Sequence, residues 1–495
     1  MQKLILSFKS LYKFIIASLI LAIPLYQKFP LISVPGTFVS IRIEDFLVLV
    51  SGSLFILFNY KKIKEYKSNM VFKAVLVFFV IALFSVVSSI VVTKTVNPLL
   101  AFVHYFRRVE YLSMLFVGYY AIKENRKGVF YYTCLIGVVV VLAFFYGLGQ
   151  RYWSWPIVIT QNQEYSKGIA LRYVEGSHIN STFAGHYDLA TYLVMFLPLM
   201  LGMFFYLRKG LGKYLFLLIY FAGLWLMVNS ASRISMMSLL ISVSLTLFLL
   251  KKLRRGFIIL VVSVLFIGFS SNLVSRYARL FQIIDEKIKN LQTQQLVSDA
   301  FAQTDSIIER RANASPTPTP VPVFEDRSTS IRLNVEWPRA LRAFSKNPLF
   351  GSGYSSITLA SDNDYLRSLG ETGLLGSLAL LLVFAWLLLY FKISFKKLDD
   401  IEKVFVSSIA GGLVGVLINA LFIDIFEASK LALSLWLFLG MTLCLMENGA
   451  PLAYASGIFS FASSEQNPPK RKNTSHSFPI KSGFPAKADK NEKTN

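Results

Sequence analysis

The amino-acid sequence predicts an all-α membrane protein with about twelve transmembrane helices. Its 495 residues are 54% hydrophobic and only 16% charged, with a mean hydropathy of +0.54, which lies outside the usual range of soluble domains. Apolar runs of about 20 residues, enough for a helix to cross a bilayer core, recur along the chain. The net charge of +23 comes from short Lys/Arg clusters between these runs and not from one basic face, so no nucleic-acid partner is expected.

Twelve apolar stretches are the candidates for transmembrane helices. The first is expected to remain uncleaved, because no small-residue cleavage site follows its apolar run. Cys134 and Cys444 each lie inside an apolar run, which supports neither a disulfide nor a thiolate metal site. The predicted spans lie near 12–27, 45–60, 70–92, 106–123, 129–149, 187–207, 213–229, 234–250, 256–274, 371–391, 403–423 and 429–446.

The basic clusters predict the topology. Lys and Arg are enriched in cytoplasmic loops, and the clusters fall in every second loop of the twelve-span arrangement. Both termini are also basic, so both are expected in the cytoplasm, and an even number of spans follows. The clusters lie at 61–67, 123–127, 208–213, 251–255 and 392–397.

The outer loop between the ninth and tenth spans, 275–370, is too long to be a simple connection. Its first part keeps apolar residues at helical spacing among charged and amide side chains, which predicts an amphipathic helix. The Pro/Thr-rich run at 312–323 predicts a semi-rigid spacer. A second helix, bearing Arg332, is expected to end before the turn-forming NPLFGSG segment at 347–353.

The chain is therefore expected to have four parts. Nine transmembrane helices occupy 1–274, the large helical outer loop occupies 275–370, and three further helices occupy 371–446. The tail at 447–495 is polar, basic and Pro-containing, which predicts a disordered cytoplasmic extension.

Arginines near the predicted outer surface are the first candidates for chemistry. Arg233 lies in a loop so short that its guanidinium must be at the membrane interface, where a charge is costly. It could serve a functional site or reach the lipid headgroups. Arg332 and Arg327 could bind phosphate oxygens through bidentate hydrogen bonds, or be solvated residues of a loop helix.

Asp362 and Asn363, just before the tenth span, are the second group of candidates. A carboxylate at this position is commonly only a helix cap. A functional site is the alternative, because Glu371 and then Gly373 and Gly376, two glycines suited to close packing, follow in the same segment.

Four segments resemble the O-antigen ligase/polymerase superfamily of bacterial surface polysaccharide assembly. Residues 172–199 are similar to the family's R…GTFxNPNxLAxYL…P segment, and residues 229–243 to its T-x-SR-gA segment. Residues 331–356 are similar to R…W…AL…F…PLLGVG. They lead into a terminal HN-x9-G-x-x-G signature, which begins with Asp-Asn here, at 362–376. Together with the hydropathy pattern, the similarity covers about 150–446.

The resemblance implies a GT-C-like membrane-embedded helical fold in the bacterial plasma (inner) membrane. Members of the family transfer a glycan from undecaprenyl diphosphate to a sugar hydroxyl, or sometimes to a protein side chain, on the outer face. They use neither a nucleotide sugar nor a metal, so no cofactor is expected. The expected partners are the undecaprenyl-diphosphate-linked donor, a glycan, lipid or protein acceptor, and membrane lipids.

The resemblance also assigns roles to the arginines. Arg233 and Arg332 fall on the two arginines that would bind the donor diphosphate and neutralise its developing charge. Arg172, from the other long outer loop at 150–186, and Arg327 are further candidates for binding the diphosphate.

The family's histidine, the implied general base for the acceptor hydroxyl, falls on Asp362, so the His-Asn pair is Asp362–Asn363 here. A carboxylate in a partly desolvated pocket can have a raised pKa and accept a proton, whereas close arginines would lower its pKa. His186, where many family members have an amide, and Glu371 are the alternative bases.

Three other interpretations stay open. A Wzy-type polysaccharide polymerase would use the same donor and show the same motifs. A polysaccharide or lipid transporter, such as a flippase, would also have many spans, but it would favour internal repeats and ionisable residues at mid-membrane. A member that has lost activity together with its histidine is the third interpretation.

Overall fold

The structure is a computed structural model. It describes residues 2–27, 31–33, 40–60, 66, 68–158, 171–174, 177–268, 331–357 and 361–447. The predicted amphipathic helix and Pro/Thr spacer of the large outer loop lie outside the described residues, as does the tail beyond Glu447.

The all-α prediction is confirmed, and each of the twelve predicted stretches contains a helix. The only strands among the described residues are the two-residue pair β1 (Ile32–Ser33) and β2 (Ser40–Ile41). The helices that match the twelve stretches are α1 (Gln2–Leu25), α2 (Ile43–Asn59), α4 (Met70–Val91), α5 (Pro98–Glu124), α6 (Gly128–Tyr152), α8 (His186–Tyr206), α9 (Leu211–Asn229), α10 (Arg233–Leu249), α11 (Leu253–Gly268), α15 (Asp364–Ser394), α16 (Asp400–Asn419) and α17 (Ser429–Glu447).

Seven of these helices are long and apolar enough to cross a membrane, counting the described residues only. They are α4, α6, α8, α9, α15, α16 and α17. Two shorter apolar helices, within α1 and at α10, accompany them. The chain is therefore a multi-pass membrane protein, and the total of twelve crossings stays a prediction.

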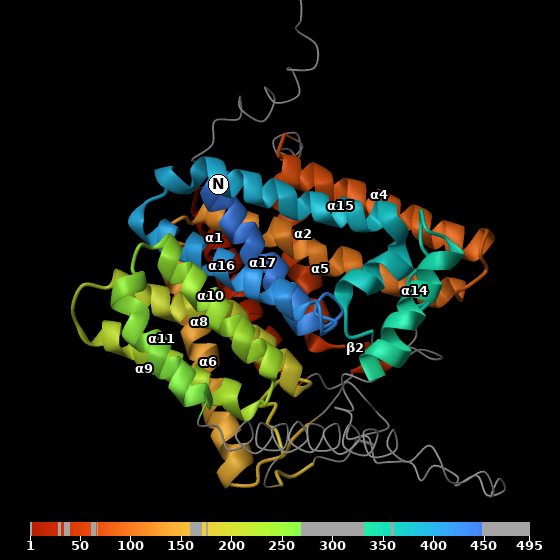
Figure 1. Cartoon of the computed structure of the whole chain (residues 1–495). Helices are drawn as coiled ribbons and strands as arrows, with labels where there is room; N and C mark the ends of the chain where they lie inside the picture. The colour runs from red at the N-terminus through yellow and green to blue at the C-terminus, as the bar shows by residue number, and fades with distance from the viewer. Residues whose placement is uncertain are drawn as a thin grey trace, which may run out of the picture. The chain divides into compact units, whose positions relative to one another are not determined.

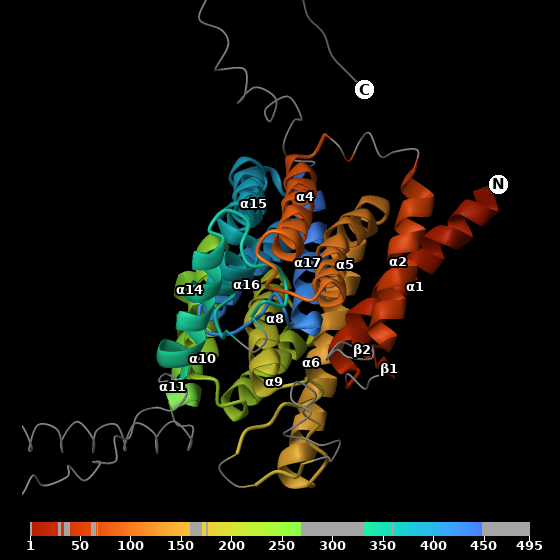
Figure 2. The same cartoon turned by 90° about the vertical axis from the view of Figure 1, so that its right-hand side faces the viewer.

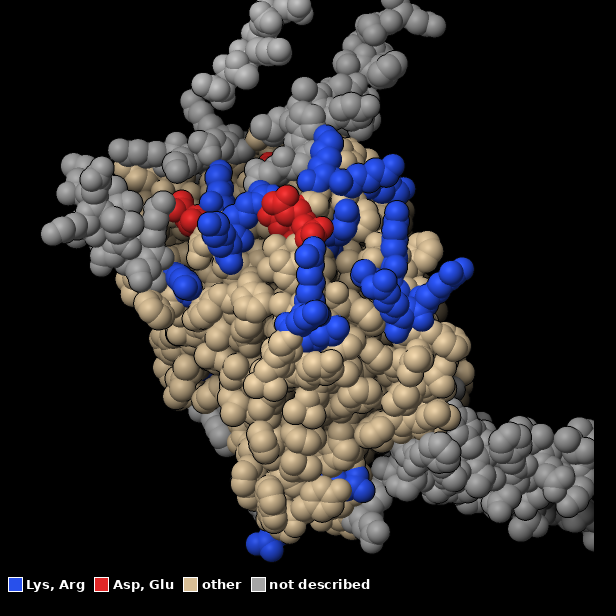
Figure 3. Space-filling view, turned by 90° about the vertical axis from the view of Figure 1, so that its left-hand side faces the viewer, with Lys and Arg blue, Asp and Glu red and all other residues tan. Residues whose placement is uncertain are grey.

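The charged side chains are unevenly distributed over the surface. On the face shown in Figure 3, Lys and Arg gather toward one end, and a broad surface below them is almost free of charge. An uncharged band is what contact with lipid chains requires, since charged groups are costly there.

Helix α17 lies in the middle of the helix bundle (Figures 1 and 2). It packs against α1, α5, α8, α15 and α16, and its most apolar window is buried throughout. Helix α8 is similarly enclosed, between α9, α10 and α16. Helices that are apolar all round belong in such positions. Helices α8 and α17 therefore form the core of the bundle, and the other helices pack around them.

The helix that carries Arg332 begins irregularly. Residues Arg332–Glu336 form one π-helical turn, in which the N–H of Trp337 donates to the carbonyl of Arg332. The regular helix α14 (Trp337–Lys346) follows and ends at Lys346, as predicted. Pro338 has no N–H and its ring crowds the preceding turn, which accounts for the wider turn at this point.

Helix α15 differs from the predicted tenth span at its start. It begins at Asp364, seven residues before the predicted position 371, and is broken at Gly373, whose φ is 68°. Gly373 was expected to serve close packing, and it does, because a Cβ on it would lie 2.4 Å from the Leu349 carbonyl oxygen; the break in the helix was not predicted. A left-handed backbone conformation is accessible to glycine at little cost, and here it opens the helix.

The NPLFGSG segment packs against this break, and it connects α14 to the turn before α15, which lies beside α14 (Figure 1). Gly351, with φ 74°, lies so close to the break that a Cβ on it would be 2.5 Å from the Glu371 carbonyl. The backbone groups freed by the break are satisfied by hydrogen bonds from Ser352 to Gly370 (2.8 Å), Gly353 to Glu371 (2.9 Å), Leu374 to Pro348 (2.8 Å) and Leu375 to Leu349 (3.1 Å).

Candidate active site

The turn before α15 places Asp362 against Arg332. Oδ2 of Asp362 accepts a hydrogen bond from Nε of Arg332 at 3.0 Å and lies 2.8 Å from its Nη2. The helix cap is the next residue, Asn363, whose side-chain oxygen accepts a hydrogen bond from the N–H of Leu366 at 2.9 Å. The capping residue and the ion-paired residue are therefore adjacent but distinct.

The two partners differ in exposure. The side chain of Arg332 is 9% exposed, whereas that of Asp362 is 29% exposed. The guanidinium also forms a hydrogen bond with Tyr187, the second residue of α8. His186 precedes it, with its ring centroid 3.8 Å from that of His178. The start of α8, with His186, is thereby brought next to the Arg332–Asp362 pair.

Arg233 lies at the same end of the bundle, as the first residue of α10. Asn419, the last residue of α16, donates hydrogen bonds to a hydroxyl of α8 at 3.1 Å and to the Ser235 hydroxyl of α10 at 3.0 Å. The N–H of Asp364 donates to the carbonyl of Ala420 at 2.9 Å. The starts of α8, α10 and α15 therefore converge on the end of α16, as a shared site requires.

The charge of Arg332 affects the pKa of two carboxyl groups, those of Asp362 and Glu336. Burial raises the pKa of Asp362, Arg332 opposes the shift and Asp424 adds to it, and the net pKa lies above the usual value. Glu336, one helical turn after Arg332, has its pKa raised to about 7, by burial first and then by the charge of Asp362, with Arg332 opposing. Both groups therefore hold a proton more readily than exposed carboxyls do.

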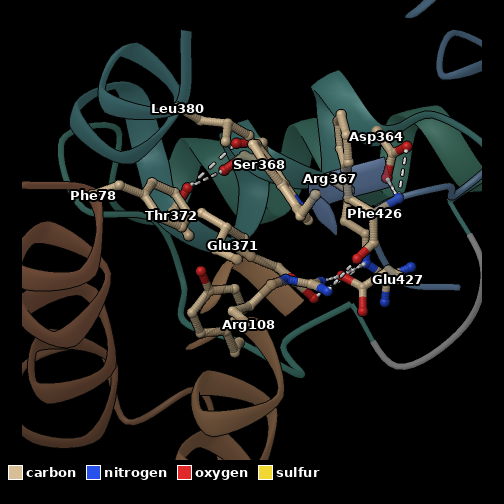
Figure 4. A pocket seen from close by; sticks show the side chains of 13 residues that line it. Phe78, Arg108, Asp364, Arg367, Ser368, Glu371, Thr372, Leu380, Phe426 and Glu427 are labelled. Carbon is tan, nitrogen blue, oxygen red and sulfur yellow. Dashed lines mark hydrogen bonds and ion pairs between the residues drawn. The ribbon is translucent and has the colours of Figure 1, made fainter. Parts of the chain in front are cut away.

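Glu371 lies in a second cluster of charges, shown in Figure 4. Its side chain is 4% exposed and is 3.5 Å from Nε of Arg367. Arg367 also pairs with Asp424 at 2.8 Å and with Glu427 at 3.2 Å, and Glu427 forms an ion pair with Arg108. Arg367 neutralises the charge of Glu371 inside this buried cluster. Glu371 is therefore poorly placed to take the proton of an acceptor hydroxyl.

The remaining predicted residues are Arg172 and Arg327. Arg172 is exposed, next to Leu171, which pairs with Ile157 in a short antiparallel bridge. Arg327 lies outside the described residues. Within the described ranges, no group of three His, Cys, Asp or Glu side chains is arranged to hold a metal ion.

Four residues of this region were not predicted from the sequence. Glu336 follows Arg332 at i+4, and Arg367 precedes Glu371 at i+4, so helical spacing could have suggested both. Asp424 lies in a predicted five-residue outer loop, where a carboxylate on the same side as Asp362 was a usable signal. For Tyr187 the sequence offered no such signal.

The arrangement has two chemical capacities. A buried guanidinium can bind an anion through charge-assisted hydrogen bonds, and a partly exposed carboxylate of raised pKa can accept a proton.

A family model described as O-Antigen ligase matches residues 216–381, a stretch that includes Arg233, Arg332 and Asp362. No curated protein matches the chain. The motifs, the helical membrane fold and this match agree, and together they support membership of the O-antigen ligase superfamily.

Proposed function

We propose that this protein is an O-antigen ligase-like glycosyltransferase that moves a glycan from undecaprenyl diphosphate to an acceptor hydroxyl on the outer face of the bacterial plasma membrane. The family match supports lipid-linked glycan chemistry in general. The donor, the acceptor and the outer-face location belong to the proposal.

The observation that carries the proposal is the direct pairing of Arg332 with Asp362. The resemblance places a diphosphate-binding arginine at the first position and a general base at the second. The two residues are 30 positions apart and come together through the NPLFGSG bend. The bend thus unites the two chemical roles that glycan transfer from a lipid diphosphate requires.

Donor binding would activate Asp362 in this arrangement. A diphosphate competes with the carboxylate for the Arg332 guanidinium, because phosphate oxygens match its planar fork. Arg332 lowers the pKa of Asp362, so its engagement with the diphosphate would let that pKa rise. Asp362 would then become a better proton acceptor when the donor is in place.

The transfer step follows from these roles. The acceptor oxygen attacks the anomeric carbon, the carbon–oxygen bond to the diphosphate breaks, and the hydroxyl proton passes to Asp362. Undecaprenyl diphosphate leaves with its charge matched by Arg332 and Arg233, a form of electrostatic stabilisation that is strong where water is scarce. Attack from the face opposite the leaving group predicts inversion at the anomeric carbon.

The proposal is tested with the purified full-length protein in lipid nanodiscs. Undecaprenyl-diphosphate glycan is supplied with candidate sugar acceptors, and the release of undecaprenyl diphosphate and the glycan product are measured. Loss of transfer in Arg233→Ala, Arg332→Ala and Asp362→Ala is the expected result. Release that these substitutions leave unchanged would refute the site, and no release with any acceptor would favour transport or an inactive protein.

The same assay separates a ligase from a Wzy-type polymerase. A ligase attaches the glycan to a different acceptor molecule, whereas a polymerase uses a second donor molecule as the acceptor. Products that lengthen when the donor alone is supplied would identify the polymerase. A control with a metal chelator tests the expected independence from metal ions.

A further inference from the structure

Asp424, in the connection between α16 and α17, binds the turn that carries Asp362. Its Oδ2 accepts a hydrogen bond from the N–H of Ser361 at 2.8 Å, and its Oδ1 accepts from the Ser361 hydroxyl at 2.7 Å. Oδ1 also accepts from the N–H of Asn363 at 3.2 Å, and Arg367 donates to Oδ2 at 2.8 Å. The carboxylate of Asp424 therefore holds the residues on both sides of Asp362, but not Asp362 itself.

The backbone conformation of Asp362 explains this geometry. Its φ of 46° is left-handed, and such a residue turns the N–H groups around it toward one side to form a concave anion site. Here the anion is the carboxylate of Asp424. Aspartate tolerates the left-handed region better than most residues, but the conformation needs support, and the bonds to Asp424 supply it.

The electrostatics keep Asp424 suited to this role. Burial alone would raise its pKa, but Arg367 and the hydrogen bonds from Ser361 and Asn363 outweigh burial, so the pKa of Asp424 lies below the usual value. It therefore remains an anion at neutral pH. Its charge also raises the pKa of Asp362.

We propose that Asp424 is a positioning residue, which anchors the 361–363 turn so that the carboxylate of Asp362 faces Arg332. The part of this inference that concerns catalysis rests on the proposed glycan transfer. The anchoring itself rests on the three hydrogen bonds from Ser361 and Asn363 to Asp424 and can be measured without any activity.

The kinetic test uses Asp424→Asn, with Asp400→Asn as the matched control. Asp400 is exposed at the start of α16, at the end of that helix remote from Asp424. Asparagine keeps the size of Asp424 but replaces one acceptor with a donor, so it should release the turn and lower kcat about 10²-fold, as expected for a small misplacement of a reacting group. The KM for the donor should stay within about twofold, since Arg332 is untouched.

A double-mutant cycle separates positioning from general damage. In an Asp362→Ala background, Asp424→Asn should lower the residual rate no further, because the group that it positions is already gone. A milder variant, Ser361→Ala, removes one of the three hydrogen bonds between the turn and Asp424 and should give a smaller loss of kcat. A full additional loss in the Asp362→Ala background would overturn the catalytic part of the proposal.

Hydrogen exchange of the peptide that spans 361–366 is the readout independent of activity. Asp424→Asn should speed amide exchange there and leave the later part of α15 unchanged, and Asp400→Asn should change neither. Unchanged exchange in Asp424→Asn would overturn the anchoring, whatever the rates. Faster exchange in a protein that transfers no glycan would overturn the proposed function and leave the anchoring intact.

Discussion

The Arg332 guanidinium contacts one oxygen of Asp362, Oδ2, through two nitrogens, Nε at 3.0 Å and Nη2 at 2.8 Å. Arg332 is almost fully buried, while the carboxylate reaches the surface. A cation held in this way is fixed before any substrate arrives, and such preorganisation is the condition for strong electrostatic stabilisation. Under the proposed glycan transfer, the pair would be a resting state from which the donor diphosphate displaces the carboxylate.

Replacing Arg332 should impair donor binding and the transfer step together. For Arg332→Ala we expect a 10²–10³-fold loss of kcat/KM, about the loss seen when one stabilising donor is removed. Arg332→Lys keeps the charge but loses the planar fork, so it should retain only part of the activity. The measurement is the initial rate of undecaprenyl diphosphate release at several donor concentrations. Arg342→Ala, an exposed arginine of α14, is the control.

Replacing Asp362 with histidine should preserve transfer. Histidine is tolerated in the left-handed region, and the imidazole would give a rate that rises with pH through its pKa, below about 6.5 because Arg332 is adjacent. Asp362→Asn has the same shape but cannot take the proton, so its rate should fall about 10²–10⁴-fold. The pH–rate profiles of the three proteins provide the check. An asparagine variant as fast as the wild type would exclude Asp362 as the base.

The sequence predicted the positions of the helices well, because hydropathy alone marks each apolar stretch. It also predicted that the Arg332 helix would end near Lys346, and the structure confirms this. The predicted start of α15, at residue 371, was wrong because the residues from Asp364 onward include charged side chains that a hydropathy pattern assigns to the loop. Arg367 and Glu371 are nonetheless helical there, since they neutralise each other and their neighbours inside the protein.

The candidate site was predicted in outline and not in its contacts. The family motifs pointed to Arg233, Arg332 and Asp362 from local sequence. The contacts of Asp424 with the 361–363 turn join residues more than 60 positions apart, and no periodicity shows such a pair. The left-handed conformation of Asp362 was likewise hidden, because aspartate is common in many turns.

Glu336 should make the stability of the protein depend on pH. Its pKa in the folded protein is about 7, against 4.5 as the ordinary value. The folded state thus keeps a proton that the unfolded chain releases, and stability must fall as the pH rises from about 4.5 to 7. Asp362 and Asp424 favour the protonated form, and Arg332 and Arg339 oppose it.

The variant Glu336→Gln removes this titration. Its free energy of unfolding should equal that of the wild type near pH 4.5 and exceed it above pH 7, by about 1 kcal/mol once solvent screening is allowed for. Its thermal midpoint should change in the same direction. Scanning fluorimetry across this range measures the difference, with Arg342→Gln as the control. A difference that is constant over the whole range would show that Glu336 does not titrate there.

The contact between Gly351 and Gly373 should tolerate no side chain. Both have left-handed φ values, 74° and 68°, and a Cβ on Gly373 would lie 2.4 Å from the carbonyl oxygen of Leu349. Gly373→Ala must therefore strain the backbone and push apart the NPLFGSG segment and α15, at a cost of more than about 2 kcal/mol. Since this contact fixes α14 relative to the 361–363 turn, transfer should fall along with the thermal midpoint.

Gly52→Ala, a helical position with nothing within 4 Å of the added Cβ, is the control and should be neutral or stabilising. A Gly373→Ala protein with the wild-type midpoint would mean that the break in α15 is not set by this glycine.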